Sequence, residues 1–173
     1  MALHIVLVEP EIPQNTGNIA RTCAATGCEL HLIRPLGFSL DDRYLKRAGL
    51  DYWSLMTLHV HDSMESFLQA YPDHRMHFAT TKAPRSYDQV QYADGDFLVF
   101  GRETRGLPED LLARCYDQCI RIPMRPEARS LNLSNSVAII AYEALRQLSF
   151  PSLSQEGALT GRSEDEHPWL DYV

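Results

Sequence analysis

Short apolar segments recur along the chain and predict the strands of a sheet. Residues 3–10 are almost continuously aliphatic up to Pro10, and further apolar runs lie at 29–35, 55–61, 74–81, 96–101 and 118–124. Apolar runs without polar alternation are typical of strands that are covered on both faces. The pattern therefore favours a buried, mostly parallel sheet.

Helical periodicity is strongest in the last part of the chain. Apolar residues recur there at i, i+3, i+4, i+7, i+8 and i+11, namely Val137, Ile140, Ala141, Ala144, Leu145 and Leu148. This spacing predicts a helix with one buried face, and Ser134 or Asn135 is its expected N-cap. Pro151 lies just beyond the expected end of the helix.

Four shorter helices are expected at 15–27, 41–49, 63–71 and 107–115. For the first of them, Asn15 or Thr16 is the expected N-cap and Gly27 the expected C-cap. Strands that alternate with helices predict an α/β fold with a mostly parallel sheet and helices on both faces. Ligands of such sheets bind at the carboxyl ends of the strands, so the loops after the strands are the candidate sites.

The chain is expected to divide into one domain at 1–151 and an acidic tail at 152–173. The tail has turn residues and acids without periodicity, which predicts mobility. The net charge is −7 for the whole chain and −4 for residues 151–173, so the rest carries only −3. A local basic patch for a nucleic acid is compatible with that value.

Several classes of protein are disfavoured by what the sequence lacks. There is no apolar run of the ~20 residues that a membrane helix needs, and the start of the chain has no signal-peptide pattern. We therefore expect a cytoplasmic protein with no membrane partner. The four cysteines do not have zinc-ligand spacing, so reduced and mostly buried thiols are expected.

Three loops carry more polar residues than a connection needs. The first, EPEIPQNTGNIAR, joins a rigid turn to a helix start and Arg21. The second, FLVFGRETRGLP, follows a buried strand, and Gly101 there would let a ligand approach the backbone. The third, IRIPMRPEARSLNLSNS, holds more small polar residues than one helix cap uses. Plain helix capping and charged strand–helix turns are the alternative explanations for each loop taken alone.

The loops do not match common nucleotide or hydrolase motifs. No G-x-G-x-x-G follows a strand, and G-x-x-x-x-G-K-[ST] is absent. All seven histidines fall outside the three loops, so neither a Ser/His/Asp arrangement nor H-E-x-x-H is present. Hydrolysis through a histidine base is therefore disfavoured.

Taken together, the three loops resemble the SPOUT superfamily of RNA methyltransferases. The signatures, in the order of the family, are NTGNIAR, LVFGRETRGL and IPMRPEARSLNLS. A fourth stretch, RAGLDYW, resembles the branch of small tRNA wobble-nucleotide ribose methyltransferases. The resemblance covers about residues 3–151. It implies an α/β fold with a C-terminal trefoil knot, a homodimer whose site is completed at the interface, and S-adenosyl-L-methionine as methyl donor without a metal.

The resemblance also implies roles for individual residues. Four match positions tied to catalysis: Asn15, Arg21, Glu103 and Asn132. Six would line the cofactor: Ala79, Thr80, Gly101, Ile122, Ser130 and Leu131. Arginine is a poor proton acceptor because its pKa exceeds ~12, so Arg21 is expected to stabilise a developing alkoxide or hold a phosphate. Glu103 is expected to orient arginines, and the proton acceptor is unassigned.

The implied substrate is the anticodon loop of a tRNA, with methylation of the ribose 2′-oxygen of the wobble cytidine or uridine and no DNA partner. Phosphate contacts are expected from Arg43, Lys46, Arg47, Lys82, Arg85, Arg102, Arg105 and Arg125. Bases could stack on Tyr44, Tyr52 and Trp53, although core packing or a dimer contact is an equal alternative. Two other functions stay open: ribosomal RNA ribose methylation, and RNA binding without catalysis on the same scaffold.

Overall fold

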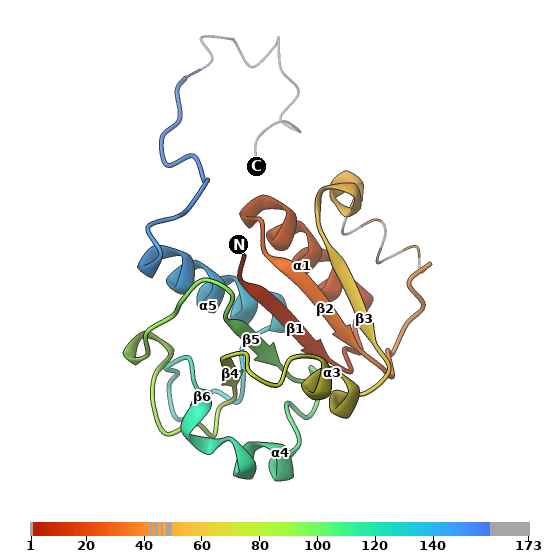
Figure 1. Ribbon diagram of the computed structural model, residues 1–173, viewed down its shortest axis with the longest axis vertical. Helices are drawn as coiled ribbons and strands as arrows, with labels where there is room; N and C mark the ends of the chain where they lie inside the picture. Colours follow the sequence, from red (N-terminus) through yellow and green to blue (C-terminus); the bar gives the residue numbers. More distant parts are fainter. Residues whose placement is uncertain (1, 42, 44, 46, 48–49, 160–173) are drawn as a thin grey trace.

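The computed structural model describes residues 2–41, 43, 45, 47 and 50–159. Its centre is a six-stranded sheet in which all paired strands are parallel, in the order β3-β2-β1-β5-β4-β6 (Figure 1). The strands are β1 (His4–Val8), β2 (Glu29–Ile33), β3 (Leu58–His61), β4 (Met76–Ala79), β5 (Phe97–Phe100) and β6 (Cys119–Ile120). The predicted parallel sheet is confirmed.

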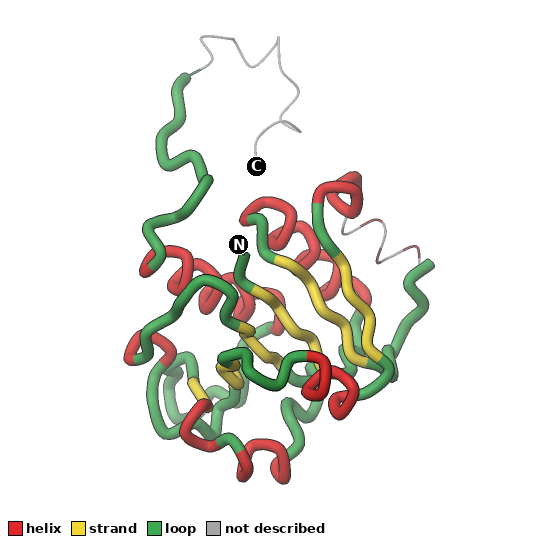
Figure 2. The backbone as a smooth tube through the Cα atoms, in the orientation of Figure 1, coloured by secondary structure: helices red, strands yellow, loops and turns green. Residues whose placement is uncertain are grey.

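Among the described residues, the α-helices whose bounds are complete connect or flank these strands, and Figure 2 draws helices in red. They are α1 (Pro13–Thr26), α3 (Met64–Ala70), α4 (Glu109–Arg114) and α5 (Leu133–Gln147). Short 3-10 helices cover Leu50–Leu55, Tyr87–Gln89 and Tyr116–Gln118. The helix expected at 41–49 lies partly outside the described residues.

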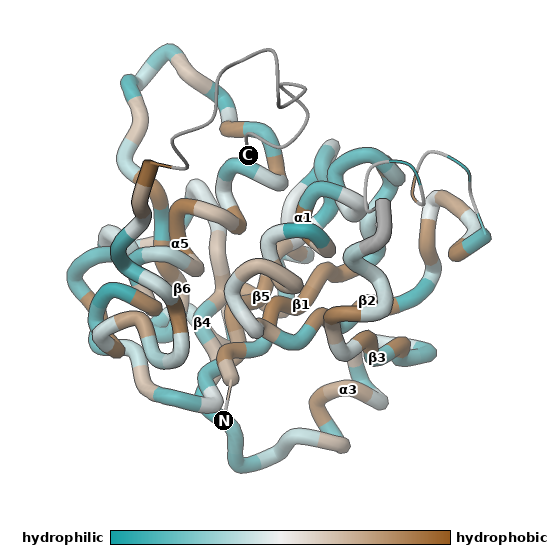
Figure 3. Tube along the Cα trace, turned by 90° about the horizontal axis from the view of Figure 1, so that it is seen from above, coloured by the Kyte–Doolittle hydropathy of each residue, from teal (hydrophilic) through white to brown (hydrophobic). Residues whose placement is uncertain are grey.

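Helices cover both faces of the sheet, as the alternation of elements predicts. On one face, α1 and α5 pack over β1, β2 and β5 through a core that includes Ile5, Ile19 and Ile140. On the other face, Phe67 of α3 and Leu111 of α4 pack against residues such as Val99. Figure 3 shows α1 and α3 on opposite sides of the apolar strands. The strands are buried because both of their faces are covered.

The ends of several elements differ from the expected ones. Ile12 is the N-cap of α1, and Pro13 takes its first position, so Asn15 and Thr16 lie inside the helix. Asn132 caps α5 instead of Ser134 or Asn135, because its side chain accepts hydrogen bonds from both of their backbone N–H groups. The strand expected at 118–124 is only the two residues of β6.

An ionic cluster closes the sheet at the amino end of β5. The carboxylate of Asp96 is almost fully buried and accepts hydrogen bonds from the Arg75 guanidinium, from His77 Nε2 at 2.9 Å and from the backbone N–H of Ala93 at 2.8 Å. Burial alone would raise the pKa of Asp96, but these hydrogen bonds outweigh it and lower the pKa to about 2. The carboxylate is thus held charged inside the fold.

The four cysteines are free, and three of them are buried, as expected. Within the described residues, no helix combines the length and apolar character needed to cross a membrane. Residues 153–159 follow α5 without helix or strand. The rest of the predicted tail, residues 160–173, lies outside the described part, so its expected mobility stays a prediction.

Candidate functional site at the carboxyl ends of β1 and β5

The loops after β1 and β5 lie next to each other, because β1 and β5 are neighbouring strands at the centre of the sheet. From β1 the chain builds outward to β2 and β3, whereas β5 lies on the other side of β1. Parallel sheets bind ligands where the strand order changes direction, outside the carboxyl ends of the strands. The loop after β1 and the loop after β5 both leave from this point. These are the first two of the three polar loops.

Glu103, in the loop after β5, binds the loop after β1. Its carboxylate accepts hydrogen bonds from the backbone N–H groups of Glu11 at 2.8 Å and Ile12 at 3.0 Å, and from Asn15 Nδ2 at 3.3 Å. The contact is reciprocal, because Glu11 in turn accepts hydrogen bonds from the Thr104 backbone N–H at 3.2 Å and from the Thr104 hydroxyl. Glu103 therefore orients a backbone loop and Asn15, where the sequence predicted that it would orient arginines.

Asn15 connects this pair of loops to the third one. It is buried, and its Oδ1 accepts a hydrogen bond from Asn132 Nδ2 at 3.0 Å. The Oδ1 of Asn132 caps α5 by accepting from the backbone N–H of Ser134 at 2.9 Å. The Nδ2 of Asn15 must face the acceptor-only carboxylate of Glu103, so its Oδ1 must face Asn132. We call Glu103, Asn15 and Asn132 the amide–carboxylate chain.

The turn after β5 is tight because two glycines allow it. The backbone of Arg102 and Gly106 forms two hydrogen bonds, and Gly106 has a φ of 66°, which favours glycine. A Cβ on Gly101 would overlap the backbone of Gly106 and Leu107. Arg102 forms an ion pair with Glu9, a residue with a φ of 51° at the end of β1. The backbone itself therefore forms this wall of the site.

A cavity of about 550 Å³ opens between the three loops. Its volume lies within the ~300–1,000 Å³ range that is usual for small-molecule sites. All six predicted cofactor residues line it: Ala79, Thr80, Gly101, Ile122, Ser130 and Leu131. Of the four predicted catalytic residues, Asn15, Glu103 and Asn132 line it as well. The structure thus brings together nine residues that lie up to 117 positions apart in the chain.

Arg21 is the predicted catalytic residue that does not line the cavity. Its guanidinium carbon lies 5.2 Å from the centre of the Tyr52 ring, in the range of a cation–π contact. Tyr52 thereby contacts an arginine in this structure, and Trp53 packs against the core beneath α1 and α5. For Trp53, the observed contacts favour core packing, one of its two predicted roles. Tyr44 lies outside the described residues.

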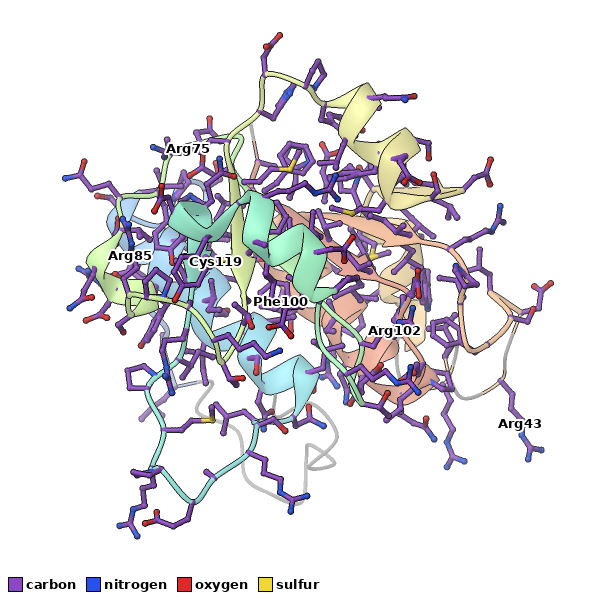
Figure 4. All side chains as sticks on the ribbon, turned by 90° about the horizontal axis from the view of Figure 1, so that it is seen from below. Arg43, Arg75, Arg85, Phe100, Arg102 and Cys119 are labelled. Carbon is purple, nitrogen blue, oxygen red and sulfur yellow. The ribbon has the colours of Figure 1, made fainter. Side chains whose placement is uncertain are left out.

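The predicted phosphate-binding residues are divided between the cavity and the outer surface. Lys82, Arg102 and Arg105 line the cavity, and Arg102 is half-buried against Glu9. Figure 4 shows Arg43 and Arg85 at the periphery of the molecule, away from the central Phe100. Arg47 and Arg125 are exposed, while Lys46 lies outside the described residues. Among the described residues of this set, only Lys82, Arg102 and Arg105 thus share the cavity.

Sequence reasoning missed several residues of the site. Glu9 and Glu11 flank Pro10 and hold the two loops together through Arg102 and Thr104, but they were not singled out. Two acids within three residues at the end of a buried strand were the available signal. Phe100, Met124 and Leu133 give the cavity apolar walls, and only their places next to the motifs could have indicated them.

Comparisons with known proteins agree with this geometry. Residues 2–142 match the SpoU rRNA Methylase family. The tRNA (cytidine(34)-2'-O)-methyltransferase of Escherichia coli (strain K12) is 53% identical over 150 residues, which cover 86% of this chain and 96% of the relative. A solved structure described as "Structural insights into the 2-OH methylation of C/U34 on tRNA" is 51% identical with a TM-score of 0.82, and the match covers 86% of this chain and 97% of that one.

A more distant solved structure resembles the same domain with a ligand bound. It is an AdoMet-bound rRNA methyltransferase from Sinorhizobium meliloti, with a TM-score of 0.75 and 28% identity, and the match covers 85% of this chain and 57% of that one. The predicted resemblance to SPOUT methyltransferases is therefore confirmed, together with the α/β fold. The trefoil knot stays a prediction. By the family match, the sequence identity and the fold, the chain belongs to the SpoU rRNA methylase family.

Proposed function

We propose that the protein transfers a methyl group from S-adenosyl-L-methionine to the ribose 2′-oxygen of nucleotide 34 in a tRNA anticodon loop, in the cytoplasm. The observation that carries the proposal is the amide–carboxylate chain, which joins the three motif loops around one cavity. The same motifs belong to a sequence that is about half identical to a protein named for this reaction.

The cavity fits an adenosine-containing methyl donor. Gly101 packs so closely against the backbone of Gly106 and Leu107 that any side chain would overlap it, so backbone forms this part of the cavity wall. Such bare backbone can approach an adenine closely and bind it through N–H and C=O groups. The apolar side chains of Ile122 and Leu133 face a lining that also contains Ser130 and Thr80. We therefore assign cofactor binding to Ala79, Thr80, Gly101, Ile122, Ser130 and Leu131.

The donor supplies an electrophilic methyl group on a sulfonium. The chain must then orient the 2′-hydroxyl, stabilise the negative charge that develops on it, and exclude water. Glu103 already accepts three hydrogen bonds within the protein, so it acts as a positioning residue for Asn15 and the loop after β1. Arg21 lies outside the cavity of its own chain, so we propose that it supplies positive charge to the alkoxide or to the neighbouring phosphate at the interface with a second copy. The acceptor of the hydroxyl proton is not assigned to a residue.

We propose that the tRNA backbone contacts the exposed arginines Arg43, Arg47, Arg105 and Arg125. Lysine and arginine contacts to phosphate supply affinity without reading sequence. Arg105 lies at the mouth of the cavity, and Arg125 lies in the segment before its third wall. Lys46 and Arg102 are assigned to the same role, and Arg102 would have to exchange its ion pair with Glu9 for a phosphate.

A second copy of the chain is the proposed protein partner. Two exposed apolar side chains lie at the cavity, Ile12 at 41% and Leu131 at 40%, and Tyr142 on α5 is 47% exposed. Exposed large apolar side chains next to a site are candidates for an interface. A homodimer through this surface would bring basic residues of both copies to one RNA. Light scattering of the unmodified protein and of Tyr142→Glu tests this arrangement.

The function is tested with methyl-labelled S-adenosylmethionine and RNA from a strain that lacks the modification. We expect label on the 2′-oxygen of tRNA nucleotide 34. Arg21→Ala should lose the label, whereas Arg114→Ala, which removes a similarly charged but exposed side chain outside the cavity, should retain it. Label on ribosomal RNA alone would show that the substrate is ribosomal RNA and not tRNA. Cofactor binding without label on either RNA would favour the binding-protein alternative.

A further inference from the structure

A cluster of imidazole side chains lies on the sheet far from the proposed active site. His4 of β1, Glu29 and His31 of β2, and His59 and His61 of β3 share one face of the sheet, because each is separated from the next on its own strand by an even number of residues. The strand register places His4 beside Glu29 and His31 beside His59. The parallel sheet therefore gathers four histidines and a carboxylate from three strands.

Three donor atoms of this cluster converge on one point. His4 Nδ1 lies 3.0 Å from His31 Nε2 and 3.8 Å from Glu29 Oε2, and all three donor atoms lie within 4.8 Å of one another. A tetrahedral ion with bonds of about 2.0–2.1 Å separates its ligand atoms by roughly 3.3–3.4 Å. The observed separations bracket that value, so small ring rotations would suffice to bind an ion.

We propose that His4, Glu29 and His31 form a binding site for a divalent transition-metal ion, of which zinc is the expected occupant. Two imidazoles and one carboxylate are a common donor set for zinc, with one position left open for water.

The surrounding groups are arranged as outer partners of metal ligands usually are. His31 Nδ1 lies 3.0 Å from His61 Nε2, so the nitrogen that would not bind the ion has a partner that fixes its tautomer. Glu29 Oε2 lies 2.7 Å from His59 Nε2, which orients the carboxylate. His31 is fully buried, but 18% of the His4 side chain and 32% of the Glu29 side chain are exposed. The ion would therefore have an entry path.

This site is separate from the cavity that the proposed function uses. The cavity lies at the carboxyl ends of the strands, whereas His4 and Glu29 are the first residues of β1 and β2. Strands of five residues place these two ends roughly 15 Å apart. The proposed ion therefore takes no part in methyl transfer. It would connect β1 to β2 at the amino ends of the strands and stabilise the sheet.

The test uses protein without a histidine tag, freed of metal by a chelator and titrated with zinc in competition with a chromophoric chelator. We expect one tightly bound zinc per chain. Glu29→Gln should weaken binding by more than about a hundred-fold, and His61→Asn, an outer partner, by about 10- to 100-fold. His74→Gln serves as the control, because His74 is exposed and is not among the donor atoms.

Cobalt provides a second measurement that does not depend on variants. In the unmodified protein, one equivalent of Co²⁺ should give the intense visible bands of a tetrahedral site, and one equivalent of zinc should abolish them. Equal zinc affinities of the unmodified protein and Glu29→Gln would overturn the proposal. Absence of both stoichiometric zinc binding and a tetrahedral cobalt spectrum would also overturn it, and would leave a hydrogen-bonded histidine chain as the function of the cluster.

Discussion

The side chain of Asn132 donates a hydrogen bond from Nδ2 to Oδ1 of Asn15 at 3.0 Å, across 117 positions of sequence. The other amide atom of each residue is also occupied, because Asn15 donates to Glu103 and Asn132 caps α5. The two asparagines therefore tie the start of α1 to the start of α5.

Asn132→Asp separates the two roles of this residue. The new carboxylate still accepts from the backbone N–H groups of Ser134 and Asn135, so the helix cap is kept. It cannot donate to Asn15, so a carboxylate oxygen would face the Oδ1 of Asn15 with no hydrogen between them. If the Asn15 amide flipped, its Oδ1 would instead face the carboxylate of Glu103. We expect S-adenosylmethionine affinity, measured by calorimetry, to fall at least about tenfold. Asn132→Ala also loses the cap and should lower the free energy of unfolding by about 1 kcal/mol. Equal affinity of Asn132→Asp and the unmodified protein would contradict this role.

Glu103→Gln tests the positioning role of the carboxylate. A glutamine keeps one oxygen acceptor but replaces the other oxygen with an NH2 group. This donor would face one of the two backbone N–H groups that now donate to Glu103. We expect the free energy of unfolding in urea to fall by about 1–3 kcal/mol, and cofactor affinity to fall with it. Glu109→Gln is the matched control, because that carboxylate is exposed and pairs with the exposed Lys82, and it should leave both quantities unchanged. A variant that keeps its stability but loses activity would instead favour direct chemistry at Glu103.

Gly101→Ala should abolish cofactor binding. The added methyl group would overlap backbone atoms of Gly106 and Leu107, which cannot move as the end of a side chain can. The turn after β5 would have to open, and the wall of the cavity would move with it. Gly157→Ala is the control, because a Cβ there meets nothing within 4 Å. Cofactor binding by Gly101→Ala at normal affinity would show that the turn tolerates a side chain.

The sequence predicted the sheet well because each strand is buried on both faces and so carries an almost continuous apolar run. Residues 3–10 are an example, since β1 is covered by helices on either side. Gly27 is the C-cap of α1, as the sequence predicted, but the predicted N-caps of α1 and α5 were wrong. Asn132, Ser134 and Asn135 are equally good cap residues, and the choice among them depends on which side chain can also reach Asn15, a contact that no local pattern contains.

The motifs predicted which loops form the site, but they did not predict the contacts that hold these loops together. Glu103 and Glu11 are 92 positions apart, and neither their pairing nor the role of Thr104 has a signature in the sequence. The histidine cluster, by contrast, had a local signal. Its residues alternate with apolar ones in ELHLI and LHVH, which places them on one face of two neighbouring strands.

Acid should destabilise the fold through Asp96. The folded-state pKa of about 2 lies below the value of about 3.9 for a free aspartate, so the unfolded chain binds more protons between these values. The stabilisation is present above about pH 4 and is lost as the pH falls towards 2. Asp96→Asn should show a smaller loss of unfolding free energy between about pH 5 and about pH 3. Asp110→Asn, at an exposed carboxylate, should follow the unmodified protein.

The long sequence separation between Asn15 and Asn132 also sets an order of events during synthesis. A ribosome releases the first loop early, but the residue that completes the cavity emerges more than a hundred positions later. Contacts between residues so far apart in sequence are slow to form, because the entropy of closing the intervening chain is lost before the contact stabilises the fold. A nascent or truncated chain that ends before Asn132 therefore lacks one wall of the cavity, and we expect it not to bind S-adenosylmethionine. Competence for binding arises only when nearly the whole domain is complete.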